Sequence, residues 1–218
     1  KRQDIEAFGL FGVARYVRER STMEFGARVE RNRIEGDAGC SASDTSLSFG
    51  ASALFALTEE DSFYAGVARS ERAPTVEERY SNVSEAGCAL PGDDHDFVLH
   101  AATNLVEIGA PGLDTERSNS LELGWRRNTA EFSAEVNLYL NRVTDYIFLS
   151  LRGEDEDERT LAYYDARDAT FSGWEARLET TLAEFEGSTL ALTVFADSVR
   201  GKFRDGGNIP RLAPGKLG

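Results

Sequence analysis

The sequence contains no run of about 20 apolar residues, the length that a membrane-spanning helix requires. Its first residues, KRQDIEAFG, are not followed by the apolar segment and small-residue cleavage site of a signal peptide. Cysteine is scarce, and the two cysteines, Cys40 and Cys88, do not form a C-x-x-C motif that could define a metal site. These absences exclude a helical membrane protein and a cysteine-based metal module, and they leave secretion open.

Basic residues are also outnumbered. The 24 Lys and Arg residues face 38 Asp and Glu residues, which gives a net charge of −14. Nucleic acid demands a basic surface, so nucleic acid is not an expected partner. The sequence has only two histidines, both in one acidic loop, which argues against a Ser or Asp/His catalytic arrangement. We therefore expect no enzyme and no catalytic residues.

What the sequence does contain is alternation with a period of two, which is typical of strands with one apolar and one polar face. It is clearest in residues 23–30, 47–53, 120–126, 132–141 and 174–179. One face is Leu, Val, Phe, Ala and Trp. The other carries charged and amide side chains: Glu24, Arg28, Glu30, Glu122, Arg126, Glu135, Asn137, Glu175, Arg177 and Glu179. Residues 4–16 are apolar on both faces, so the pattern does not orient them.

The expected connections alternate in length. Short turns are predicted near 17–22, 58–62, 126–131 and 184–188, and long polar loops near 31–45, 70–117, 149–165 and 198–215. Phe25, Phe63, Trp125 and Phe132 stand beside the short turns, as in an aromatic girdle at a membrane interface. This rhythm predicts an all-β, antiparallel, up-and-down transmembrane β-barrel with short periplasmic turns and long extracellular loops. About eight strands and the start of a ninth at 215–218 make it a partial barrel.

One short helix is predicted inside the second long loop. Pro74 lacks an N–H and ends the preceding strand. Thr75 can cap a helix from Val76 to about Tyr80, and Glu78 would complete a capping box.

Four segments together resemble the barrels of TonB-dependent receptors. Residues 68–81 (ARSERAPTVEERYS) are similar to S-R-S-x-R-A-P-T-x-x-E-L-Y. Residues 107–109 (EIG) and 111–124 (PGLDTERSNSLELG) resemble F-E-x-G-N-P-x-L-K-P-E-x-S-x-x-x-E-L-G. Residues 139–147 (YLNRVTDYI) and 169–175 (ATFSGWE) resemble F-Y-N-x-x-x-D-Y-I and A-x-x-x-G-x-E. The sequence departs from these patterns at Arg79, Ala110 and Thr115, which concern local loop packing.

The resemblance implies a barrel of about 22 strands with a plugged lumen. Residues 1–218 would then be part of the barrel domain, without the plug domain and the C-terminal strands. It also implies uptake of a scarce nutrient across the outer membrane of a Gram-negative bacterium, energised by the TonB–ExbB–ExbD complex through the plug. Outer-membrane lipid and lipopolysaccharide would surround the wall, and no cofactor would be required.

The loop that contains both histidines is the candidate metal site. His95, His100, Asp93, Asp94 and Asp96 supply imidazole and carboxylate groups, which suit zinc and similar ions. His100-Ala101-Ala102-Thr103, followed by Glu107-Ile108-Gly109, also resembles the H-x-A-T…F-E-x-G of zinc-uptake receptors. The transported ligand would then be zinc or a metal chelate. The alternative is a solvated acidic loop with incidental histidines.

Other assignments have two interpretations each. Arg69 and Arg72 could bind an anionic chelate or pair with carboxylates inside the barrel. Cys40 and Cys88 could form a disulfide between two loops or remain thiols. Residues 154–158 (EDEDE) form a solvated loop tip or bridge to lipopolysaccharide through divalent cations. Two rival folds are a complete eight-stranded outer-membrane barrel with a structural or adhesive role and a soluble sandwich.

Overall fold

The computed structural model describes residues 3–36, 39–84, 86–93, 96–155, 157–210, 212 and 215–218. In this part of the chain, no helix is long and apolar enough to cross a membrane. The elements are β1 (Gln3–Arg18), β2 (Ser21–Gly36), β3 (Ser41–Ala56), β4 (Asp61–Arg72), α1 (Val76–Tyr80), β5 (Val106–Ile108), β6 (Glu116–Asn128), β7 (Phe132–Glu154), β8 (Thr160–Phe185), β9 (Ser188–Phe203) and β10 (Lys216–Leu217).

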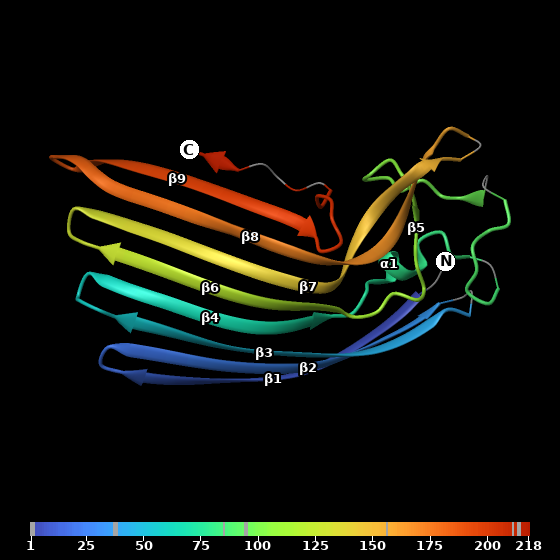
Figure 1. Cartoon of the computed structure of the whole chain (residues 1–218), viewed down its shortest axis with the longest axis horizontal. Helices are drawn as coiled ribbons and strands as arrows, with labels where there is room; N and C mark the ends of the chain where they lie inside the picture. Colours follow the sequence, from blue (N-terminus) through green and yellow to red (C-terminus); the bar gives the residue numbers. More distant parts are fainter. Residues whose placement is uncertain are drawn as a thin grey trace.

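The strands form one antiparallel up-and-down sheet in the order β1-β2-β3-β4-β6-β7-β8-β9-β10 (Figure 1). The short strand β5 lies off this path and pairs in parallel with β8. Eight long strands and the start of a further one at β10 confirm the strand count expected from the sequence. Within the described residues β1 does not pair with β9 or β10, so this sheet is open and is not a closed eight-stranded barrel.

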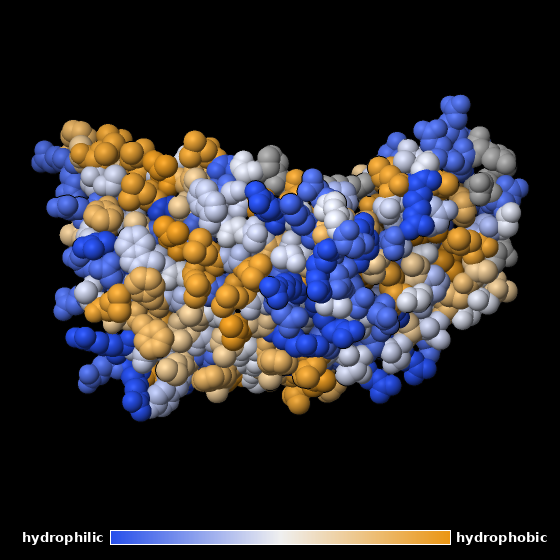
Figure 2. Space-filling model, in the orientation of Figure 1, coloured by the Kyte–Doolittle hydropathy of each residue, from blue (hydrophilic) through white to orange (hydrophobic). Residues whose placement is uncertain are grey.

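The strand register gathers the apolar residues on one face, which we call the apolar face. One cross-strand row on it runs Phe55–Phe63–Trp125–Val136–Ala176–Ala196. Leu121, Leu123 and Leu138 lie on the same face and are 42%, 48% and 51% exposed. In Figure 2 hydrophobic residues spread over much of the left half of the sheet, and hydrophilic residues gather across its middle. The apolar face is therefore not the core of a soluble domain, and the sandwich interpretation fails.

The opposite, polar face carries charges that neutralise one another. Arg126 pairs with Glu135 at 2.9 Å and Arg177 with Glu179 at 2.9 Å. Arg15 pairs with Glu24 at 2.8 Å, and Arg28 also pairs with Glu30. Polar walls that are removed from bulk water require such partners.

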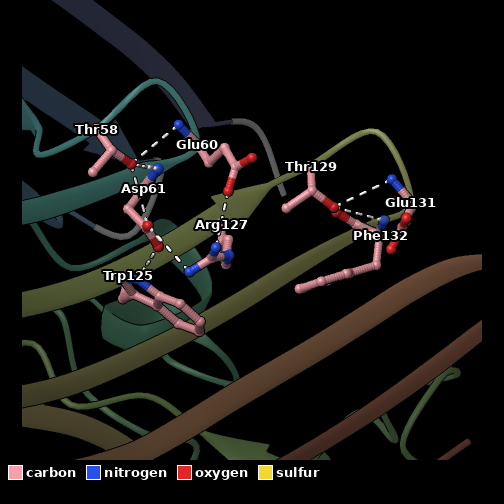
Figure 3. A network of polar contacts seen from close by, with 8 residues as sticks. All are labelled: Thr58, Glu60, Asp61, Trp125, Arg127, Thr129, Glu131 and Phe132. Atoms are coloured by element: carbon pink, nitrogen blue, oxygen red, sulfur yellow. Dashed lines mark hydrogen bonds and ion pairs between the residues drawn. The ribbon is translucent and has the colours of Figure 1, made fainter.

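At the turn end of the sheet, where the connections between strands are short, two turns use the same threonine hydrogen-bond pattern (Figure 3). Thr58 Oγ1 accepts hydrogen bonds from the backbone N–H groups of Glu60 and Asp61, at 3.2 and 2.8 Å. Thr129 Oγ1 does the same for the N–H groups two and three residues later, at 3.2 and 3.0 Å. The hydroxyl satisfies backbone donors that a tight turn leaves unpaired.

Trp125 is anchored at this end by its polar atom. The Asp61 carboxylate accepts hydrogen bonds from Trp125 Nε1 at 3.2 Å and from Arg127 at 3.3 Å, and Glu60 holds the other side of Arg127 at 2.9 Å (Figure 3). The register places the aromatic residues Phe25, Phe63, Trp125 and Phe132 on the apolar face. An indole with its ring on an apolar surface and its N–H on a polar rim suits a membrane interface.

Two of the predicted long loops are wrong. Only four residues, 37–40, separate β2 from β3, and only five, 155–159, separate β7 from β8. The rest of the predicted loops continues as paired strand, because a hairpin that has left the wall is bathed in water on both sides and needs no apolar face. A bulge at Val143/Tyr146, with Asp145 at φ 56°, marks where β7 and β8 change direction, and the pair bends away from the sheet in Figure 1.

Candidate functional site

The long connection between β4 and β6, residues 73–115, folds back over the polar face; we call it the cap. Its helix α1 begins as the sequence predicts. Thr75 accepts a hydrogen bond from the Glu78 backbone N–H, and the Glu78 carboxylate accepts one from the Thr75 N–H at 2.7 Å, which completes the capping box. Glu78 also holds Arg72 at 2.8 Å, so the end of β4 is tied to the start of the helix.

Two buried polar side chains fasten the cap. Arg79 pairs with Asp44 on the polar face of β3 at 2.8 Å and donates to the Leu113 carbonyl at 2.9 Å. Asn82 uses both ends of its amide. Its Nδ2 donates to the carbonyls of Val98 and Glu107, at 3.0 and 2.8 Å, and its Oδ1 accepts from the Val98 N–H at 2.7 Å. A buried amide with these partners fixes three cap segments against one another.

Gly109 allows the cap to close on itself. A Cβ at this position would lie 2.5 Å from the carbonyl carbon and oxygen of Arg79. The Gly109 N–H donates to the Ser81 carbonyl at 2.8 Å. The residue before it, Ile108, is almost fully buried in β5. Glycine is therefore required here for backbone approach.

A disulfide between Cys40 and Cys88 joins the cap to the β2–β3 hairpin, with a Cα–Cα distance of 4.9 Å. Cys40 belongs to a small buried cluster with Ile34, Tyr80 and Val83. The crosslink thus lies beside the packing of the cap onto the wall.

Four polar side chains, three from the cap and one from β8, form a series of hydrogen bonds. Thr103 Oγ1 donates to Glu107 Oε1 at 2.6 Å and lies 3.2 Å from His100 Nδ1. Since the hydroxyl hydrogen points to the carboxylate, the imidazole Nδ1 is assigned as the N–H that donates to Thr103. In the neutral imidazole, Nε2 of His100 then keeps a free lone pair, which is the form that binds a metal ion.

The last member of this series of hydrogen bonds is Tyr164 on β8, which donates its hydroxyl hydrogen to Glu107 Oε2 at 2.8 Å. Burial, followed by the hydrogen bond to Glu107 and the charges of Glu107, Glu77 and Glu78, raises the pKa of Tyr164. The phenol therefore stays protonated and remains a donor. Glu107 is buried, and among the ion pairs of the described residues it has only His100, at 3.6 Å.

Two of these residues, His100 and Glu107, line a pocket of about 690 Å³. Its walls come from α1, from the residues after it and from the His100 segment: Val76, Glu77, Tyr80, Ser81, Asn82, Val98, Leu99, His100, Ala101, Ala102 and Glu107. An imidazole and two carboxylates therefore face a space large enough for a small ligand.

The structure brings together only part of the predicted metal cluster. His100 lines the pocket, whereas Asp93 and Asp96 are exposed outside it, and Asp94 and His95 lie outside the described residues. Among the residues that the structure describes, no three His, Cys, Asp or Glu side chains lie close enough together to hold a metal ion.

The two predicted anion-binding arginines lie on different faces. Arg72 lies on the polar face and pairs with Glu78 and Glu116, at 2.8 and 3.2 Å. Arg69 lies opposite Phe49 and therefore on the apolar face, where it pairs with Glu71 at 3.2 Å. The expectation that Arg69 faces the barrel interior is wrong, because residues 69 and 72 are three apart on one strand and their side chains therefore point to opposite faces.

Sequence reasoning missed two residues of the site. Tyr164 comes from a hairpin 57 residues beyond Glu107 and has no motif around it. Asn82 lies two residues after α1, but nothing in the sequence distinguishes a buried amide from an exposed loop residue. Only the partners on other segments reveal them.

An open antiparallel wall with an apolar outer row, a charge-paired inner row and a capped polar side defines a class, the membrane β-barrel with external loops. The chain belongs to the TonB-dependent receptors: the family model described as TonB dependent receptor-like, beta-barrel, matches residues 1–215. Members of this family are transport receptors of the Gram-negative outer membrane.

Solved structures show the same fold at low sequence identity. The chain is similar to the copper transporter OprC, with a TM-score of 0.75, 20% identity, and coverage of 98% of this chain and 31% of that one. It is also similar to the FrpB iron transporter from Neisseria meningitidis, with a TM-score of 0.62, 17% identity, and coverage of 92% and 26%. The FpvAI–pyocin S2 complex gives a TM-score of 0.64 at 13% identity, over 99% of this chain and 26% of that one. The chain thus spans less than a third of each of these structures.

Proposed function

We propose that this chain is part of the barrel wall of a receptor that imports a transition-metal ion or a small metal chelate, and that the pocket beside His100 contacts the cargo. The observation that carries the proposal is the hydrogen-bond chain from His100 through Thr103 to Glu107. It orients the imidazole and leaves Nε2 free, which is how proteins prepare a histidine for a metal.

The charge of the pocket favours a cation. Glu107 is buried, and its ion-pair partner in the described part of the chain is a histidine, with no lysine or arginine. Glu77 adds a second carboxylate to the pocket wall. A positively charged cargo would supply the charge that the buried carboxylate lacks.

Zinc is the first candidate and copper the second. Imidazole and carboxylate oxygen are suitable zinc ligands, and the pocket lining contains neither the thiolate nor the thioether that selects Cu(I). Copper is included because OprC is named a copper transporter. Since no three-ligand group occurs among the described residues, we propose that water, the carrier of the metal, or other parts of the receptor complete the coordination.

The remaining roles follow from family membership and belong to the whole receptor. We propose that a plug domain lies within the completed barrel, that the TonB–ExbB–ExbD complex energises uptake through that plug, and that the wall lies in the outer membrane. The girdle beside the short turns would then meet the periplasmic interface, and the cap would face the outside of the cell.

The test is calorimetric titration of the full-length receptor with Zn²⁺, Cu²⁺ and a ferric chelate. His100→Ala should weaken Zn²⁺ binding by at least tenfold, and Thr103→Val should weaken it by about tenfold because the imidazole loses its orienting partner. Thr103→Ser keeps the hydroxyl and should bind as the unmodified receptor does.

His95→Ala is the matched control, because it removes the other histidine of the same loop. Unchanged Zn²⁺ and Cu²⁺ affinity in His100→Ala would overturn the assignment of the pocket. Tight binding of the ferric chelate together with no binding of either free ion would overturn the choice of cargo.

A further inference from the structure

On the apolar face, charged side chains begin within a few residues of one another along neighbouring strands, and most of the first ones are basic; on β1 and β8 they are Glu6 and Asp168. Following each strand from its short turn toward the cap, the first charged residue beyond the apolar stretch is an arginine on five of the long strands. These arginines are Arg31 on β2, Arg69 on β4, Arg117 on β6, Arg142 on β7 and Arg200 on β9.

Two of these arginines, Arg69 and Arg142, lie in one cross-strand row together with Lys202. The register pairs Arg69 with Asn119, Asn119 with Arg142, Arg142 with Thr170, and Thr170 with Lys202. Neighbouring strands are about 4.8 Å apart, so a cation occurs about every 10 Å along this row. Arg200 lies two residues before Lys202 on the same face. We call Arg69, Arg142, Arg200 and Lys202 the basic row.

Most of the basic row has no carboxylate partner. Within the described chain, Arg142, Arg200 and Lys202 are exposed and form no ion pair or side-chain hydrogen bond, and Arg31 behaves likewise. The arginines of the polar face are different, since Arg126 and Arg177 each hold a glutamate at 2.9 Å. At the turn end of the apolar face, Arg127 is also neutralised, by Glu60 and Asp61.

The position of the row tells which anion can meet it. The row borders the apolar stretch on the side of the cap, so it lies at the outer boundary of the membrane in the orientation proposed above. An arginine on the lipid-facing surface costs much less free energy near an interface than at the midplane. Long basic side chains can also reach along the surface toward head groups.

We propose that the basic row binds the phosphate groups of lipopolysaccharide in the outer leaflet. Guanidinium groups bind phosphate in a bidentate manner, and several of them spaced along one row fit a head group that carries more than one phosphate. The chain as a whole has a net charge of −14, so a cluster of unpaired cations on its lipid-facing side is not a consequence of composition. The acyl chains of the same molecule would pack on the apolar stretch below.

The experiment quantifies the lipopolysaccharide that co-purifies with the full-length receptor after a wash with EDTA. The triple variant Arg142→Gln, Arg200→Gln, Lys202→Gln should retain at least tenfold less. The matched control Arg15→Gln, Arg126→Gln, Arg177→Gln makes the same chemical change on the polar face and should retain the normal amount. Heat-modifiable migration in gels shows that both variants are folded.

A second measurement separates the lipid sources. Native mass spectrometry would follow binding of bis-phosphorylated lipid A, dephosphorylated lipid A and phosphatidylglycerol to the unmodified receptor. Preference for the phosphorylated lipid A supports the proposal. The proposal would be overturned if phosphatidylglycerol bound as well as phosphorylated lipid A, or if the triple variant retained as much lipopolysaccharide as the unmodified receptor. Complete loss of lipopolysaccharide from the unmodified receptor after EDTA would also overturn it, and would assign the binding to divalent cations that bridge to acidic loops.

Discussion

At His100, the direction of one hydroxyl hydrogen decides which imidazole nitrogen is free. Thr103 donates to Glu107, so the imidazole must donate to Thr103 through Nδ1, and Tyr164 supplies the second donor to the carboxylate. A buried carboxylate that loses one such donor is left with an unsatisfied acceptor, which costs about 1–3 kcal/mol. The residues around the His100 imidazole therefore act as a unit.

Gly109→Ala tests how closely the cap packs at the residue scale. The added methyl group would collide with the Arg79 carbonyl, which is backbone and cannot move aside without shifting α1. We expect a local destabilisation of about 1–3 kcal/mol, typical of overpacking. Hydrogen exchange of residues 76–82 in the full receptor should accelerate.

Gly112→Ala is the control for this substitution, because a Cβ there would meet nothing within 4 Å. Equal exchange rates in the two variants would show that the approach of Gly109 to α1 does not hold the cap.

Part of this residue-scale picture could be predicted from the sequence. The H-x-A-T and E-x-G spacing grouped His100, Thr103 and Glu107, and the capping box predicted Thr75 and Glu78 correctly, because these contacts span few residues. The contacts of Arg79 with Asp44 and of Glu107 with Tyr164 span 35 and 57 residues, and no local pattern encodes such pairings.

At the scale of elements, the cap is held to the wall by an ion pair, a small apolar cluster and the Cys40–Cys88 disulfide. The crosslink closes a loop with a sequence separation of 48 residues, and the chain-entropy relation gives about 4 kcal/mol of stabilisation for a loop of that length. This stabilisation is comparable to the free energy that is needed to open a surface loop locally.

Cys88→Ser should therefore loosen the cap while leaving the wall intact. We expect faster proteolysis and faster hydrogen exchange within residues 73–115, with unchanged protection of β6 and β7. Mass spectrometry of the unreduced, unmodified receptor should show the Cys40–Cys88 peptide pair. Two free thiols in protein isolated from the outer membrane would contradict the crosslink.

Element types were easier to predict than element ends. Alternation located β2, β3, β6, β7 and β8, because one face of each is apolar throughout the wall. The ends of β2, β7 and β8 were misplaced, because strand pairing persists beyond the wall through backbone hydrogen bonds alone. The same absence of a facial pattern hid the position of Arg69, which lies where the apolar stretch of β4 ends.

At the scale of the whole molecule, the sheet has one apolar face and one polar face, and we proposed above that the apolar face lies in the membrane. Leu123→Arg places a charge in the middle of the apolar face, where we expect a loss of about 2–4 kcal/mol in the free energy of folding into a bilayer. Urea titration of the full receptor in lipid vesicles measures this quantity.

Ser120→Arg is the matched substitution on the polar face of the same strand, opposite Ala68 and Asn141. It should cost much less, since that face is built from charged and amide groups. A smaller loss for Leu123→Arg than for Ser120→Arg would reverse the assignment of the two faces.

The bulge at Val143/Tyr146 has a consequence for how such a receptor can vary. Beyond the bulge, β7 and β8 continue as a hairpin of paired strands, which we call the arm. The pairing of the arm is set separately from the pairing of the wall below the bulge, so residues added to or removed from the arm change its length without shifting the register of the wall. The bulge would therefore let the outer end of the β7–β8 hairpin change between related receptors while the strand register below the bulge stays the same.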